Sequence, residues 1–103
     1  MINTSLEKIA AVVDQLVLEI TLPLRTAKAL DKTALRKLTE CLDELETVLT
    51  TEMMVPKSLA GNLWFIFIAM LEEAQYAKQN RQEIEIEAWK IAERLRQIFG
   101  PKW

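Results

Sequence analysis

The stretch LRKLTECLDELETVL, residues 35–49, decides the fold of this chain. Its leucines recur in alternating steps of three and four residues, at Leu35, Leu38, Leu42, Leu45 and Leu49. This spacing places them on one side of an α-helix, with the charged residues on the other side. The pattern covers two heptads, which is too short for a free-standing coiled coil but sufficient for a seam inside a helical bundle.

A helix with the same kind of periodicity precedes this seam. It begins at Thr4, whose hydroxyl forms a capping-box pattern with Glu7 three residues later. Pro23 lacks an amide hydrogen and disfavours helical geometry in the residue before it, so we expect this helix to end or kink there. Asp31 then provides an N-cap for the leucine-rich helix.

Two more helical segments follow the seam. Ser58 can cap a third helix that is apolar on nearly all sides, and Gly100 with Pro101 stops a fourth. Only the capping pattern of Asn80 and Glu83 separates these two, so one long helix is the alternative. We predict an all-α, antiparallel four-helix bundle, with helices over residues 4–22, 31–54, 58–79 and 81–99.

Length and composition indicate a small globular protein. At 103 residues, half of them apolar, we expect a single helical domain over residues 1–103. The formal net charge of −2 offers no long-range attraction to phosphates, so we expect no nucleic-acid partner. A single cysteine, Cys41, favours a reducing compartment, and we predict a cytoplasmic protein. The longest apolar run, residues 63–71, is too short to span a bilayer, and we expect no membrane partner.

The residue types present exclude much of enzyme chemistry. The chain contains no histidine, so it has neither a Ser/His nor a Cys/His nucleophile pair. Glu40, Asp43 and Glu44 cluster on the helix of the leucine seam, where a hard cation or an acid/base pair is conceivable. A solvated polar face, which every amphipathic helix has, is the explanation that we favour. We predict that the protein is not an enzyme and has no catalytic residues, no metal site and no cofactor.

Apolar residues on the wrong side of two helices are the candidate functional site. On a helical wheel, Phe65 and Ile68 lie opposite the core face of the third helix, with Gly61 and Trp64 beside them. In the fourth helix Ile86 and Trp89 lie among charged residues. Apolar side chains rimmed by polar ones are typical of protein-binding surfaces. The alternative is that the third helix is central and that Phe65 and Ile68 belong to the core.

These features favour a non-enzymatic protein-binding module. In size, acidity and helical build the chain resembles small bacterial helper proteins, namely immunity proteins that block a toxin, secretion chaperones and phage-encoded inhibitors. This resemblance concerns bulk properties and implies no site residues. The leading prediction is an immunity or inhibitor protein that docks Gly61, Trp64, Phe65, Ile68, Ile86 and Trp89 on a protein partner. The alternative is a homodimeric structural or scaffold subunit.

Overall fold

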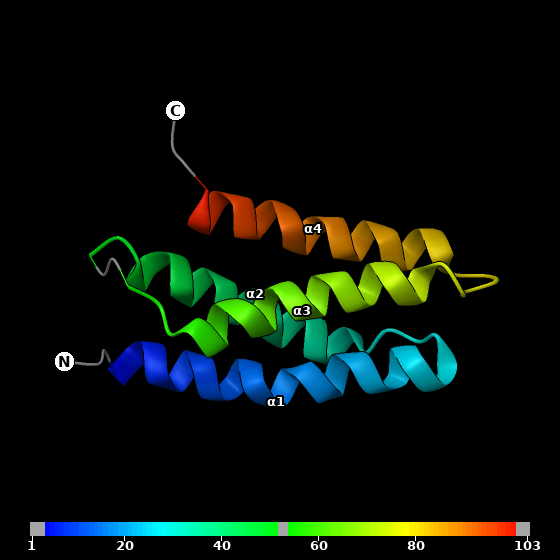
Figure 1. Ribbon diagram of the computed structural model, residues 1–103, viewed down its shortest axis with the longest axis horizontal. Coiled ribbons are helices and arrows are strands. Elements are labelled where there is room, and N and C mark those ends of the chain that lie inside the picture. Colours follow the sequence, from blue (N-terminus) through cyan, green and yellow to red (C-terminus); the bar gives the residue numbers. More distant parts are fainter. Residues whose placement is uncertain (1–3, 52–53, 101–103) are drawn as a thin grey trace.

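The structure, a computed structural model, describes residues 4–51 and 54–100. It contains helices α1 (Thr4–Ala27), α2 (Lys32–Val48), α3 (Lys57–Ala74) and α4 (Arg81–Phe99), and the described residues contain no strand. Consecutive helices run in opposite directions (Figure 1). The predicted all-α four-helix bundle is confirmed.

The helices are arranged as two antiparallel hairpins, α1 with α2 and α3 with α4. The hairpins pack so that α1 lies beside α3 and α2 beside α4. These side-by-side pairs run parallel, because Asn62 of α3 contacts Asp14 of α1 while Glu73, further along α3, contacts Lys28 at the far end of α1. Helix α3 therefore lies between α1 and α4 (Figure 1), which leaves one long side of α3 facing solvent.

Helix α1 continues through Pro23 to Ala27, and neither the break nor the kink predicted at this proline is confirmed. A proline inside a helix costs about 3 kcal/mol. On either side of it Ile20 and Leu24 are buried, and burial of one large apolar side chain contributes about 1.5–3 kcal/mol. Tertiary packing thus offsets the proline penalty. The chain leaves the helix at Lys28, which adopts a left-handed conformation with φ of 51°.

Helices α2 and α3 are both shorter than predicted. Helix α2 ends at Val48, because the hydroxyls of Thr50 and Thr51 donate to carbonyls of its last turn and compete with further helix. The rest of its predicted range lies partly at residues 52–53, outside the described residues. Helix α3 ends at Ala74, and a turn over residues 75–80 separates it from α4. The alternative of one long helix is wrong.

The predicted N-caps have mixed outcomes. The carboxylate of Asp31 accepts a hydrogen bond of 3.0 Å from the amide of Ala34, as an N-cap should. Asn80 occupies the N-cap position of α4, but its side chain instead donates a 2.7 Å hydrogen bond to the carbonyl of Lys28. That bond ties the α3–α4 turn to the end of α1. Ser58 lies inside α3, whose N-cap is Pro56.

The leucine seam of α2 supplies one wall of the core, as predicted. Leu38, Leu42 and Leu45 are at most 1% exposed, whereas Leu49 at the C-cap is only partly buried. The other walls come from the inner faces of the remaining helices, and the core includes Leu16, Ile20, Leu24, Leu59, Leu63, Ile66, Met70, Ile84 and Leu95.

Among the described residues, no helix combines the length and the apolar character that are needed to cross a membrane.

Candidate protein-binding surface

Four of the predicted site residues lie on the outer side of α3. Trp64 and Phe65 are each 42% exposed and Ile68 is 47% exposed, whereas Leu63 on the inner side of the same helix is 0% exposed. Gly61 is exposed, and a Cβ atom built on it would meet no other atom within 4 Å. The alternative that Phe65 and Ile68 belong to the core is therefore wrong.

An aromatic cluster joins this side of α3 to the two predicted residues of α4. The ring of Phe67, which is buried, contacts Trp64 edge-on at 6.1 Å and Trp89 edge-on at 5.3 Å between centroids. Edge-to-face pairs of this kind contribute about 0.5–1.5 kcal/mol beyond area burial. Trp89 is 59% exposed, and Ile86, one turn earlier on α4, is 49% exposed. Phe67 thus links Trp64 of α3 to Trp89 of α4. We call the exposed predicted residues of the two linked helices the apolar face: Gly61, Trp64, Phe65, Ile68, Ile86 and Trp89.

The apolar face is large for a protein of this size. A large side chain presents about 200 Å² when fully accessible, so the exposed fractions of its five large side chains correspond to roughly 500 Å². The largest apolar patch on a typical monomer is about 300–600 Å² and is often functional. The apolar face therefore lies in the upper part of that range.

Two leucines of α1 extend the apolar face, and the sequence prediction missed both. Leu18 is 67% exposed and Leu22 is 57% exposed. Asp14 accepts a 3.3 Å hydrogen bond from Asn62, and Leu18 lies one turn after Asp14 on the parallel helix, which places it level with the part of α3 that carries Phe65. The signal was present in the sequence, because these leucines are four residues apart and opposite the core face of α1.

The charges next to Ile86 and Trp89 are largely paired within α4. Arg96 forms a 2.6 Å ion pair with Glu93 and lowers the pKa of that carboxyl through its hydrogen bond. Ion pairs join Lys90 to Glu87 at 3.2 Å and Arg81 to Glu85 at 3.4 Å. The charged residues around Ile86 and Trp89 thus form a rim that is close to neutral on this helix.

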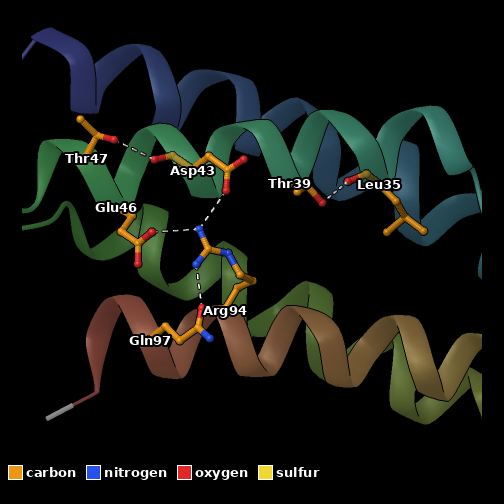
Figure 2. Close-up of polar contacts among 7 residues, drawn as sticks. All are labelled: Leu35, Thr39, Asp43, Glu46, Thr47, Arg94 and Gln97. Carbon is orange, nitrogen blue, oxygen red and sulfur yellow. Dashed lines mark hydrogen bonds and ion pairs between the residues drawn. The ribbon is translucent and has the colours of Figure 1, made fainter. Parts of the chain in front are cut away.

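Beside Trp89, which is one of its lining residues, α2 and α4 leave a groove of about 550 Å³ between them. Figure 2 shows Arg94 of α4 reaching across this seam, where its guanidinium contacts Asp43 at 2.9 Å and Glu46 at 3.3 Å and donates to Gln97 at 2.7 Å. Burial lowers the pKa of Arg94, but the hydrogen bonds and charges of these carboxylates outweigh that effect and raise it overall. Thr39, which also lines the groove, donates to the carbonyl of Leu35. The polar groups at this seam are therefore already paired within the chain.

The acidic residues of α2 and Cys41 were the candidates for metal binding or catalysis in the sequence. Within the described ranges, no group of three or more Cys, Asp or Glu residues is placed to hold a metal ion. Asp43, one of the clustered acids of α2, is engaged by Arg94. Cys41 is buried, and burial, followed by the charges of Glu44 and Glu40, raises the pKa of its thiol. A thiol with a raised pKa is a poor nucleophile at neutral pH.

Comparison with known proteins adds no functional information. No protein-family model, curated protein sequence or solved structure matches this chain.

Proposed function

We propose that the protein is a non-enzymatic protein-binding module that docks the apolar face on a protein partner. The observation that carries this proposal is the exposure of Trp64, Phe65 and Trp89 on the two linked helices, although the core is complete without them. Exposed aromatic side chains held on rigid helices are typical anchors of protein interfaces. Leaving them in water costs free energy that a partner recovers by covering them.

Rigidity supports the same proposal. The rings of Trp64 and Trp89 both rest on Phe67, which limits the rotamers available to them before binding. A side chain that is already ordered loses less conformational entropy in a complex, and immobilising a mobile one costs about 0.5–1.5 kcal/mol. The two tryptophans are thus preorganised as anchors.

The form of this function that we favour is an immunity or inhibitor protein, or a chaperone-like one, acting in the cytoplasm of a bacterium. Exposed apolar side chains on the outer sides of helices suit the blocking of another protein's surface better than the enclosure of a small molecule. The near-neutral rim on α4 means that apolar contact, rather than attraction between opposite charges, would supply most of the affinity.

Affinity capture from the native host tests this proposal. The bait is the full chain, compared with a double variant, Phe65→Ser with Trp89→Ser, which removes an anchor from each helix. Phe67 loses its contact with Trp89 in this variant but keeps its contact with Trp64. We expect a protein that co-purifies with the unaltered chain to be lost with the double variant. Retention of every captured protein by the double variant would show that the apolar face does not bind them.

The matched control is Tyr76→Ser. Tyr76 is an aromatic residue in the turn after α3 and is 71% exposed, outside the apolar face. Its removal changes the exposed aromatic surface by a similar amount, so we expect capture to be unaffected. Circular dichroism of the unaltered chain and of both variants checks that the helices remain formed.

The alternative function is a homodimeric structural or scaffold subunit, in which a second copy of the chain covers the apolar face. The distribution of charge along α3 favours this alternative and is developed below.

A further inference from the structure

The outer side of α3 carries a row of six residues that remain exposed in the monomer. They recur at steps of three and four residues, apart from the adjacent pair at its centre, which places them within one face of the helix. The row, which we call the α3 stripe, consists of Lys57, Gly61, Trp64, Phe65, Ile68 and Glu72. All six are exposed. At about 1.5 Å per residue the stripe is roughly 22 Å long, which is the length of a helix–helix contact.

The stripe has opposite charges at its two ends. Lys57 begins α3 and Glu72 lies in its last turn. Neither side chain forms an ion pair with another described residue. They differ in this respect from the charged residues of α4 beside the apolar face, most of which are paired.

The order of residues in the stripe is symmetric about its centre. Lys57 and Glu72 are equally far from the point midway between Trp64 and Phe65, and so are Gly61 and Ile68. When two such helices pack antiparallel about a two-fold axis through that midpoint, each lysine faces the glutamate of the other helix. Each isoleucine then faces the glycine of the other helix. Because Trp64 and Phe65 lie about 100° apart around the helix, the two Trp64 rings meet at one edge of the contact and the two Phe65 rings at the other.

Gly61 fits this arrangement and has no evident role within the monomer. Glycine in the middle of a helix is less favourable than alanine by about 0.5–1 kcal/mol. The space where its side chain would be is empty, so nothing inside the chain requires a glycine there. An opposing Ile68 would fill that space, as a side chain of one helix fills a gap on the surface of another.

We infer that the partner of the α3 stripe is a second copy of this chain, bound antiparallel about a two-fold axis between Trp64 and Phe65. This inference develops the alternative function, the homodimeric subunit, and it rests on the proposal that the apolar face binds a protein. Closed two-fold dimers are the most common oligomers, and their interfaces require a surface that is complementary to itself. The α3 stripe meets that requirement in charge, in shape and in the placement of its aromatic rings.

Sedimentation equilibrium of the full chain tests the inference, and we expect a dimer. Ile68→Glu places a carboxylate in the centre of the contact and should leave only monomer. Lys57→Glu should weaken dimerisation about tenfold, because two attractive pairs per dimer become repulsive. Glu72→Lys should have a similar effect for the same reason.

The decisive variant combines the two charge reversals. Lys57→Glu with Glu72→Lys restores opposite charges across the axis, so we expect its dissociation constant to return to within about threefold of the original. Arg36→Glu, at an exposed position on α2 that lacks an ion pair to other described residues, is the matched control and should leave dimerisation unchanged.

The possible results separate this inference from the proposed function. A chain that remains monomeric at high concentration would overturn the dimer. If that monomer still captured a host protein through Phe65 and Trp89, the protein-binding function would stand with a different partner. A dimer whose double charge reversal failed to recover would overturn the antiparallel register. A monomer that also captured no protein through the apolar face would overturn both.

Discussion

Helices α2 and α3 lie in the same bundle but use their outer sides differently. The outer side of α2 is polar, and Asp43 and Glu46 there are held by Arg94 of α4. The outer side of α3 carries two aromatic rings and an isoleucine between a lysine and a glutamate that form no ion pair with another described residue. Folding of the monomer explains the sequence of α2 at nearly every position, whereas it explains only the inner half of α3.

This difference separates two reasons for an apolar residue to be present. The leucines of α2 contribute to stability because the bundle removes them from water. Ile68 and Phe65 are equally apolar, but the monomer leaves much of their surface exposed, so their contribution to folding is small. A residue that adds little to stability and lowers solubility is best explained by an interaction outside the chain.

The largest effect on the free energy of unfolding is expected from a buried leucine of α2. Leu45 is 0% exposed, and its replacement by alanine should lower the free energy of unfolding by about 2–5 kcal/mol. Ile68→Ala in α3 removes a similar side chain from the half-exposed α3 stripe. It should change the free energy of unfolding of the monomer by less than about 1 kcal/mol. Urea denaturation at low chain concentration measures both. Equal losses would show that the α3 stripe belongs to the core after all.

The same distinction explains which features the sequence could predict. The leucine seam and the C-terminal stop at Gly100 were predictable because a periodic burial pattern and a helix terminator are local signals. The apolar face was predictable for a related reason, since Phe65, Ile68, Ile86 and Trp89 break that periodicity.

Other features depend on contacts between helices that are distant in the sequence. The parallel packing of α1 against α3 could not be read from local patterns, and neither could the hydrogen bond from Asn80 to Lys28. The exposure of Leu18 and Leu22 was missed because α1 has enough other apolar residues to fill its core face. The continuation of α1 through Pro23 was missed because burial of the neighbouring residues outweighs a local propensity.

A smaller effect on the free energy of unfolding is expected at Gly61, on the exposed side of α3. Gly61→Ala should raise the free energy of unfolding of the monomer by about 0.5–1 kcal/mol, because alanine restricts the unfolded chain and meets nothing in the folded one. Thermal denaturation at low chain concentration measures this gain. Gly100→Ala is the control, since a Cβ there would clash with the carbonyl of Arg96 and should destabilise. A loss of stability from Gly61→Ala would mean that the space around it is already occupied.

The smallest expected effect concerns the polar side of α2. Arg94 joins α4 to Asp43 and Glu46, and this network is partly open to solvent. Ion pairs of this kind typically contribute about 0.2–1 kcal/mol and weaken with salt. Arg94→Gln should therefore lower the free energy of unfolding by about 0.5 kcal/mol in dilute buffer, and high salt should remove most of the difference.

A double-mutant cycle with Asp43→Asn, measured by urea denaturation, isolates the coupling between the two side chains. A loss as large as that of Leu45→Ala, independent of salt, would show that the α2–α4 seam depends on this contact for its packing, and the polar side of α2 would then be as structural as its leucine seam.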